Sequence, residues 1–310
     1  MMRRYVTADV FADRLFGGNP LAVVLDARGL STRQMQALAL EFNYSESTFV
    51  FPPENPAHTA RVRLFTPRTE VPFAGHPNVG TAFLLAQQVE FAAATATGRF
   101  TFEEAAGLVP LTLLRERGAT LGAELRAPEQ LSRRAIVSRE TTARCLSLGV
   151  DEVSVTTHAP QVASVGLPFV IAEVASRDAL RRSRPNIAAY EELLPLDDAD
   201  AIFAYTREPA VAGSGGETVL HARMFSPLDG IIEDPATGSA VAAAVTLLTS
   251  LDAANPGERA WRVHQGADMG RPSLLLARTV TAGAGSPATY VGGRCVAVLK
   301  GTFTLVGEDS

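Results

Sequence analysis

The chain contains two copies of one pattern of residue types, and each copy places polar groups where the start of a helix could bind an anion. The first copy consists of Arg63-Leu64-Phe65-Thr66-Pro67 followed by His76-Pro77-Asn78-Val79-Gly80-Thr81-Ala82. The second consists of Arg223-Met224-Phe225-Ser226-Pro227 followed by Asp234-Pro235-Ala236-Thr237-Gly238-Ser239-Ala240. Proline is favoured at the first position of a helix, so His76 and Asp234 are the predicted N-caps. The exposed N–H groups of a helix start bind carboxylates and phosphates.

The two copies differ at the predicted cap, which is His76 in one and Asp234 in the other. A plain helix cap is the alternative interpretation of each residue. A glycine, a hydroxyl residue and an alanine recur at the same spacing in both copies. This recurrence favours binding sites over plain caps, although shared ancestry alone would also preserve the three residues. Gly80 and Gly238 are expected to let the backbone approach a ligand.

Glu46 stands at the entrance to an apolar strand predicted over residues 48–51, after a predicted helix that begins with the capping box Ser31–Gln34. A carboxylate at such an entrance can act as a general acid or base. By position alone, a solvated or edge-strand charge is the preferred interpretation.

Other charged residues have structural interpretations. Glu70 and Glu233 are expected to form salt bridges with Arg63 and Arg223. Aligning Phe203 with Phe49 places Asp200 close to the counterpart of Glu46 in the second half, which makes Asp200 a candidate second acid.

Length and internal repetition predict two domains. The 310 residues suffice for two cores. The expected boundaries are residues 1–127 for the first half, to which a strand at 297–310 returns, and 128–296 for the second. Strands and helices mix without the strict alternation of a doubly wound sheet.

Composition excludes several classes of protein. A net charge of −5 without a basic stripe gives no footprint for nucleic acid. The longest apolar stretch, residues 236–251, is too short to cross a membrane, and the N-terminal residues lack a secretion signal, so a cytoplasmic location is expected. The two cysteines and five histidines show no metal-ligand spacing, so no metal is expected.

Several motifs together resemble the PhzF family of phenazine biosynthesis, which shares the diaminopimelate epimerase fold. They occur in the family's order along nearly the whole chain: Asp9-Val10-Phe11, Gly18-Asn19-Pro20, Ser45-Glu46-Ser47-Thr48-Phe49-Val50, Phe73-Ala74-Gly75-His76-Pro77, Glu233-Asp234-Pro235-Ala236-Thr237-Gly238-Ser239-Ala240, Gln265-Gly266 and Gly270-Arg271-Pro272-Ser273.

The resemblance implies an α/β fold with mixed sheets, in which each of two pseudo-symmetric domains is a sheet wrapped round a central helix, with the active site in the cleft between them. It also implies a homodimer that acts on a small carboxylate without a cofactor. Glu46, Asp234 and His76 are the expected catalytic residues, with Glu46 as the main acid/base. The expected substrate-binding residues are Asn19, Ser45, Gly75, Asn78, Thr237, Gly238 and Ser239.

The residue types favour proton transfer beside a carboxylate. Glu46 would carry the proton, the helix starts would stabilise negative charge, and Asp234 would orient the substrate or take the opposing role. The related epimerases use two cysteines at the starts of the central helices, whereas Cys145 and Cys295 lie elsewhere, so an isomerase acting on an amino-acid-like or cyclic carboxylic acid is favoured. An epimerase or lyase in the same cleft, and a metabolite-binding protein without activity, remain as alternatives.

Overall fold

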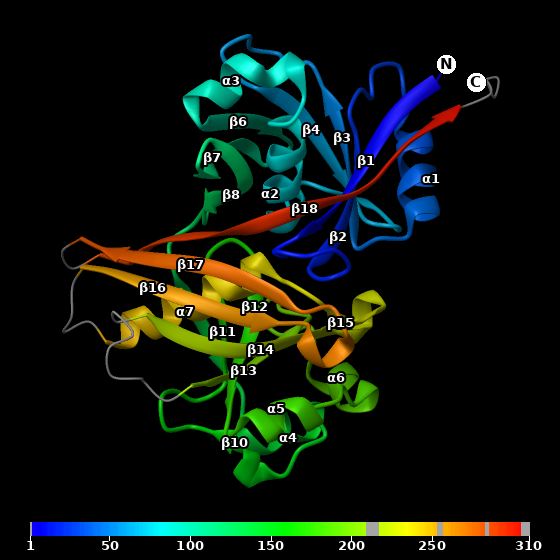
Figure 1. The fold of residues 1–310 in the computed structure, drawn as a ribbon. Coiled ribbons are helices and arrows are strands. Elements are labelled where there is room, and N and C mark those ends of the chain that lie inside the picture. The colour runs from blue at the N-terminus through cyan, green and yellow to red at the C-terminus, as the bar shows by residue number, and fades with distance from the viewer. Residues whose placement is uncertain (1, 209–216, 253–256, 283–284, 305–310) are drawn as a thin grey trace. The chain divides into compact units, whose positions relative to one another are not determined.

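The computed structural model describes residues 2–208, 217–252, 257–282 and 285–304, and the chain divides into two compact units (Figure 1). Unit 1 comprises Met1–Leu125 and Gly292–Ser310, and unit 2 comprises Arg126–Val291. The last strand therefore contributes to unit 2 at its start and to unit 1 from Gly292 onward.

The strands of unit 1 close into a ring. They are β1 (Met2–Val10), β2 (Asn19–Val24), β3 (Glu46–Phe51), β4 (Ala60–Phe65), β5 (Glu70–Val71), β6 (Arg99–Glu104), β7 (Gly107–Glu116), β8 (Ala119–Arg126) and the later part of β18 (Ala288–Thr304). Around the ring, β18 pairs with β1, followed by β2, β3, β4, β6, β7 and β8, and β8 pairs again with β18. The β2–β3 and β4–β6 pairs are parallel, so the sheet is mixed.

Helix α2 (Gly75–Leu85) fills this ring (Figure 1). Every residue from His76 to Leu85 is buried, as expected for a helix that contacts strands on all sides. Gly80 explains how close the contact is: a Cβ there would lie 2.6 Å from side-chain carbons of both Leu21 and Val10. Gly80 therefore serves helix-to-sheet packing, and the expected approach of its backbone to a ligand is not needed to explain it.

The other helices of unit 1 are α1 (Thr32–Phe42) and α3 (Ala92–Thr97), with the 3-10 turn η1 (Val89–Phe91) before α3. The predicted capping box is present, because Ser31 accepts from the Gln34 backbone and the Gln34 side chain accepts from Ser31 N–H. Asn43 closes the helix in the left-handed conformation. Met35 and Ala39 of α1 pack on Phe49 of β3.

Unit 2 contains a second mixed sheet. Its strands are β9 (Ser132–Ile136), β10 (Val153–Ser154), β11 (Gln161–Ser164), β12 (Pro168–Val174), β13 (Ile202–Arg207), β14 (Thr218–Ser226), β15 (Ile231–Asp234), β16 (Gly257–Gln265), β17 (Ser273–Thr281) and the start of β18. The main order is β9, β11, β12, β13, β14, β16 and β17, in which the β12–β13 and β14–β16 pairs are parallel.

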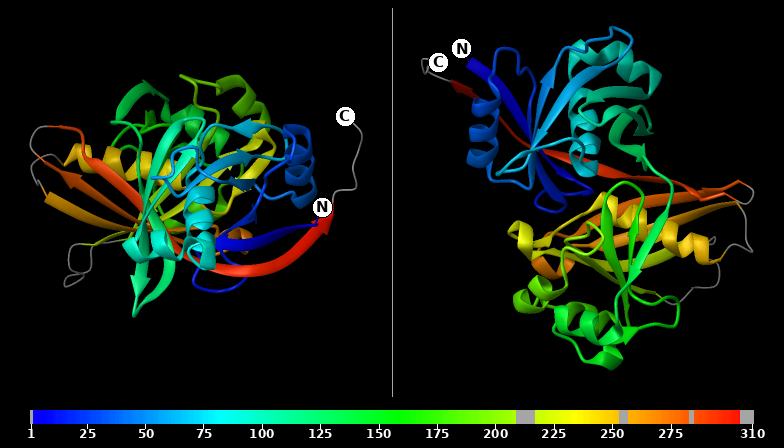
Figure 2. Two further views of the ribbon diagram at one scale, coloured as in Figure 1. Left: turned by 90° about the horizontal axis from the view of Figure 1, so that it is seen from above. Right: turned by 180° about the vertical axis from the view of Figure 1, so that it is seen from behind.

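Helix α7 (Gly238–Leu251) is the central helix of unit 2 and packs on β11, β12, β16 and β17 (Figure 2). Hydroxyl pairs tie it to the strands: Thr246 bonds Thr289 at 2.5 Å and Thr249 bonds Thr279 at 2.8 Å. The remaining helical segments are α4 (Arg139–Cys145), η2 (Val150–Glu152), α5 (Arg177–Arg182), α6 (Ile187–Leu193), η3 (Pro227–Asp229) and η4 (Ala267–Met269). Each unit thus has the expected sheet around a central helix.

Candidate active site

Glu46 and His76 are brought together in unit 1. Glu46 opens β3, and Nδ1 of His76, in the first turn of α2, lies 3.5 Å from Oε2 of Glu46. A bond of 2.8 Å between the hydroxyls of Thr48 and Thr81 joins the same strand to the same helix. The carboxylate and the imidazole are therefore held by two elements that are fastened to each other.

The contact between Glu46 and His76 joins a carboxylate to a neutral ring. Burial lowers the pKa of His76 to about 3, and the backbone of Pro20 opposes this to a smaller degree. The imidazole is 6% exposed, and within the described residues its Nε2 has no hydrogen-bond partner. At neutral pH His76 thus adds no positive charge, and the contact is not an ion pair.

Three predicted substrate-binding residues of unit 1 lie on the neighbouring segments. The Ser45 hydroxyl donates to Oδ1 of the buried Asn19 at 3.3 Å. Asn19 opens β2, which runs parallel to β3 with Leu21 opposite Glu46. Asn78 is fully buried and donates from Nδ2 to the carbonyl of Ala74 at 3.0 Å.

The start of α2 differs from the prediction. Ala74 is the N-cap, with extended backbone, so His76 lies inside the helix and is not its cap. The helix ends at Leu85. Pro77 is the third helical residue, which the fold tolerates because no N–H in the first turn has an intrahelical acceptor.

In unit 2 the turn between β15 and α7 holds Asp234 rigidly. The Thr237 hydroxyl donates to Oδ2 of Asp234 at 2.5 Å. Gln265 closes the turn by donating to the Asp234 carbonyl at 2.8 Å and to the Thr237 hydroxyl at 3.0 Å, and by accepting from Thr237 N–H at 3.1 Å. Gln265 was not among the predicted site residues, and its place in the Gln265-Gly266 motif is the signal that could have identified it.

The start of α7 also corrects the sequence prediction. Asp234 ends β15, where it pairs with Met224, and the N-cap is Thr237. Pro235 is therefore not the first helical residue, because strand pairing extends through Asp234. Gly238 and Ser239 are the first two residues of α7, so these predicted binding residues do lie at a helix start.

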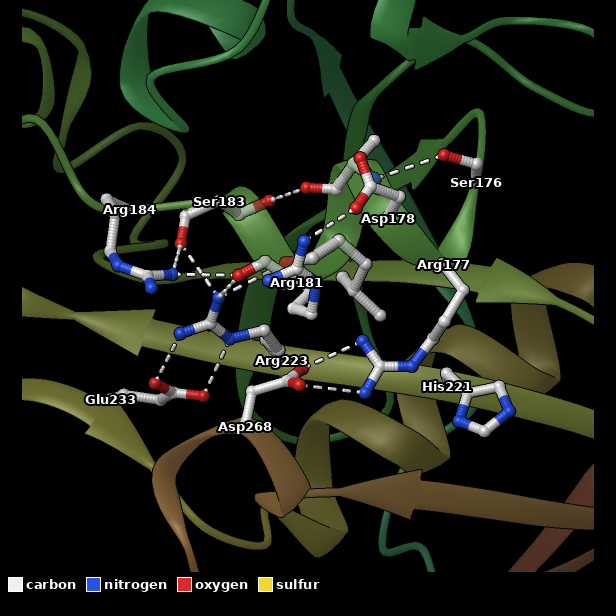
Figure 3. Close-up of polar contacts among 12 residues, drawn as sticks. Ser176, Arg177, Asp178, Arg181, Ser183, Arg184, His221, Arg223, Glu233 and Asp268 are labelled. Carbon is white, nitrogen blue, oxygen red and sulfur yellow. Dashed lines mark hydrogen bonds and ion pairs between the residues drawn. The ribbon is translucent and has the colours of Figure 1, made fainter.

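The predicted salt bridges occupy equivalent places in the two units. Arg63 binds Glu70 through two bonds of 2.6 Å, and Arg223 binds Glu233 through bonds of 2.8 and 2.6 Å. Figure 3 shows that the buried Arg223 also faces the end of α5, where it donates to the carbonyls of Leu180, Arg181 and Ser183. Because Glu233 precedes Asp234, this network anchors the strand that carries Asp234.

A second ion pair in Figure 3 fixes the segment after Gln265. Arg177, at the start of α5, donates to both carboxylate oxygens of Asp268 at 2.8 and 2.9 Å. Gly266, with φ +73°, lies where a Cβ would meet the carbonyls of Arg271 and Pro235. The turn that carries Gln265 is therefore packed against the Asp234 turn.

Asp200 lies one residue before the structural counterpart of Glu46. The parallel registers place Ala22 opposite Ser47 and Val170 opposite Ile202. The segments Gly18-Asn19-Pro20-Leu21-Ala22-Val23 and Gly166-Leu167-Pro168-Phe169-Val170-Ile171 align Ala22 with Val170. The structural counterpart of Glu46 is therefore Ala201. Burial and neighbouring Asp229 raise the pKa of Asp200 to about 6.

The two cysteines are unsuited to acid/base work. Burial raises the pKa of Cys145 to about 11 and that of Cys295 to about 12. Both are free and buried.

A surface cavity of about 460 Å³ in unit 1, between Gln87 and Arg115, contains none of the predicted site residues. Among the described residues, no group of three or more histidine, cysteine, aspartate and glutamate side chains is arranged to hold a metal ion.

Comparison with known proteins decides the family. A family model described as phenazine biosynthesis-like protein matches residues 8–301. The chain belongs to this family. It is 39% identical to an uncharacterized isomerase of Mesorhizobium japonicum, over 98% of this chain and 99% of the relative. It is 34% identical to the trans-2,3-dihydro-3-hydroxyanthranilate isomerase of Pseudomonas aeruginosa, over 98% of this chain and the whole relative.

The fold comparison agrees with the family. A PhzF-family phenazine biosynthesis protein of Bacillus anthracis superposes with a TM-score of 0.85 at 24% identity, covering 98% of this chain and all of that one. The expected family, fold class and enzyme class, an isomerase, are thereby confirmed. The roles of individual site residues stay predictions.

In the described part of the chain, no helix is long and apolar enough to span a membrane.

Proposed function

We propose that this protein is a cofactor-independent isomerase that moves a proton on a small cyclic or amino-acid-like carboxylic acid, with Glu46 as the acid/base. The observation that best supports this role is the approach of Glu46 Oε2 to within 3.5 Å of a neutral, buried His76. A neutral imidazole can donate a hydrogen bond that orients a carboxylate without cancelling its basicity.

In the proposed reaction, the Glu46 carboxylate removes a proton from one carbon of the substrate. The electron pair of the broken C–H bond forms a new double bond, and the electron pair of the existing double bond moves to the carbon that receives the proton, where it forms the new C–H bond. The carboxylic acid of Glu46 then returns a proton to that second carbon, so substrate and product have equal mass. Helix-start N–H groups stabilise the negative charge that develops.

We assign Asp234, Thr237, Gly238 and Ser239 to substrate binding and orientation from unit 2. Asp234 suits an orienting role because Thr237 and Gln265 fix its turn on both sides. We also expect a homodimer, as the family resemblance implies.

The first substrate to test is trans-2,3-dihydro-3-hydroxyanthranilate, because a relative with 34% identity is named for it. The purified protein is incubated in heavy water with this compound and with a panel of amino and cyclic hydroxy acids, and deuterium uptake is measured by mass spectrometry. Glu46→Gln is compared with Glu41→Gln, which changes an exposed glutamate of α1.

We expect uptake at one carbon in wild type and in Glu41→Gln, and a loss of about 100-fold or more in Glu46→Gln. Full turnover by Glu46→Gln would contradict the proposed role. NMR of the product separates a shifted double bond from inverted configuration, which would indicate an epimerase, and a change in mass would indicate a lyase. Binding of compounds without any uptake would favour a metabolite-binding protein.

A further inference from the structure

The side-chain amide of Gln265 can take only one orientation. Its Oε1 accepts from the backbone N–H of Thr237 at 3.1 Å, and its Nε2 donates to the carbonyl of Asp234 at 2.8 Å. A backbone N–H can only donate and a carbonyl oxygen can only accept, so exchanging the amide oxygen and nitrogen would break both hydrogen bonds. Gln265 is 1% exposed. The direction of each of its hydrogen bonds is therefore fixed.

This orientation also fixes the hydroxyl hydrogen of Thr237. Nε2 of Gln265 has two hydrogens, and the one that does not go to the Asp234 carbonyl goes to Oγ1 of Thr237 at 3.0 Å. The Thr237 hydroxyl donates its own hydrogen to Oδ2 of Asp234 at 2.5 Å, and among the described residues it has no other acceptor. Hydrogen bonds thus run in one direction, from Gln265 through Thr237 to the side chain of Asp234.

The length of the last hydrogen bond indicates an ionised acceptor. Hydrogen bonds between two oxygen atoms are usually about 2.7–2.8 Å long, and they shorten to about 2.5–2.7 Å when the acceptor is a carboxylate. The bond from Thr237 to Asp234 has the shorter length. A proton on Oδ2 of Asp234 would place two hydrogens between the same two oxygens, which is unfavourable. The arrangement therefore favours the ionised form of Asp234.

The first copy of the repeated motif lacks this arrangement. Aligning the prolines of the two copies places His76 at the position of Asp234 and Val79 at the position of Thr237. Valine has no hydroxyl that could donate, and histidine has no carboxylate that could accept. Shared ancestry would preserve the same residue types in both copies. The pairing of Asp234 with Thr237 therefore indicates a role that belongs to unit 2 alone.

The backbone that carries the Gln265 amide is held by its neighbours. Gln265 ends β16, where it pairs with Ala222 of β14 and with Ser273 of β17. The next residue, Gly266, has φ +73°, and a Cβ there would lie 2.6 Å from the carbonyl oxygen of Pro235. Gln265 is thus held between two strands and against the turn that contains Asp234.

Two other carboxylates on neighbouring elements have partners of their own. Glu233 precedes Asp234 in β15, so its side chain points to the opposite face of the strand, where it binds Arg223 through two hydrogen bonds. Asp268 of η4 binds Arg177, also through two hydrogen bonds. The Thr237 hydroxyl therefore donates to Asp234 and to neither of these carboxylates.

We propose that Gln265 is a positioning residue that fixes the Thr237 hydroxyl as a donor and thereby keeps Asp234 an ionised hydrogen-bond acceptor. Asp234 then orients the substrate and does not donate a proton to it, which leaves proton transfer to Glu46. The consequence for catalysis rests on the proposed function, in which Asp234 either orients the substrate or takes the role opposed to that of Glu46.

The first test is NMR of the full chain with carboxyl-labelled aspartate, which requires no substrate. The Asp234 signal, assigned through its absence in Asp234→Asn, should titrate at higher pH in Thr237→Val and in Gln265→Met than in wild type. Because Gln265 acts through the Thr237 hydroxyl, the double variant should titrate at the same pH as Thr237→Val alone. Gln161→Met, which changes another buried glutamine of unit 2, should match wild type.

A second NMR measurement does not depend on the folding of Gln265→Met. With glutamine labelled in the side-chain nitrogen, the Gln265 signal is assigned through its absence in Gln265→Glu, which has nearly the same shape. This signal should shift in wild type at the pH where Asp234 titrates, and it should stay constant in Thr237→Val. Additive shifts of the Asp234 midpoint in the double variant would overturn the proposal. So would a Gln265 signal that does not follow Asp234 in wild type.

The catalytic consequence is measured as kcat/KM on the substrate that the protein accepts. Gln265→Met should lower kcat/KM about 10-fold, which corresponds to one lost hydrogen bond, and Gln161→Met should leave it nearly unchanged. Wild-type kcat/KM in Gln265→Met would contradict a positioning role. If wild type shows no deuterium uptake while the titrations follow the expected pattern, the proposed function is wrong and the action of Gln265 on Asp234 stands.

Discussion

Nδ1 of His76 lies 3.5 Å from Oε2 of Glu46, and burial keeps that imidazole neutral. The pair therefore differs from an imidazolium–carboxylate couple, in which the ring would lower the proton affinity of the carboxylate. A neutral neighbour is compatible with the proposed role of Glu46 as acid and base. The same burial has a consequence for stability that can be measured without a substrate.

The free energy of unfolding should fall as the pH falls from about 6.5 toward 3, because His76 binds a proton in the unfolded chain but stays neutral in the folded protein. Between pH 6.5 and 4.5 this contribution amounts to about 2 kcal/mol. His76→Asn should remove that part of the pH dependence. Urea unfolding of wild type and His76→Asn at pH 7 and pH 4.5 measures this pH dependence. If the free energy of unfolding fell by the same amount in both proteins between the two pH values, the assignment of a buried neutral ring would be contradicted.

Thr237→Val should reduce isomerase activity, because it removes the donor to Asp234 and the acceptor for the Gln265 amide. A hydrogen bond to a charged group is worth about 1.5–3 kcal/mol, which corresponds to a loss in kcat/KM of roughly 10- to 100-fold. Thr237→Ser restores the hydroxyl and should recover most of the activity.

The matched control for that variant is Thr246→Val. It removes a buried hydroxyl from the same helix, where Thr246 bonds Thr289. This change should lower the free energy of unfolding and leave kcat nearly unchanged. If kcat fell by the same factor in Thr237→Val and Thr246→Val, the effect of Thr237→Val would be due to a less stable helix. It would then not be due to a changed orientation of Asp234.

The two equivalent ion pairs should differ in their contributions to stability. Side-chain exposures are 4% and 10% for Arg223 and Glu233, against 25% and 34% for Arg63 and Glu70. Glu233→Ala leaves a buried guanidinium and should cost about 3 kcal/mol, whereas Glu70→Ala should cost about 1 kcal/mol. Urea unfolding of the two variants measures the difference, and a larger loss from Glu70→Ala would contradict this ranking.

Local sequence patterns predicted the elements whose stabilising contacts are themselves local. The Ser31–Gln34 capping box marked the start of α1, where the structure has Ser31 as the N-cap. The repeat predicted the salt bridges Arg63–Glu70 and Arg223–Glu233, because a strand and the short hairpin after it keep these partners near each other.

Helix starts were predicted less well. Prolines at positions 77 and 235 indicated two caps, but strand pairing continues through Asp234, and α2 begins at Gly75. The sequence alignment that placed Asp200 with Glu46 was shifted by one residue. Two apolar segments can be aligned in neighbouring positions almost equally well, whereas the hydrogen bonds between paired strands fix a single register.

The sequence by itself determined the family, the two-fold repetition and the list of polar residues, since these depend on residue types and their order. Only the tertiary structure decided that Gly80 lies against Leu21 and that Gln265 holds the Asp234 turn through hydrogen bonds. In each case the partners are distant in the chain. Their contacts follow from how the strands pair around the central helix, and residue types along the chain do not specify that pairing.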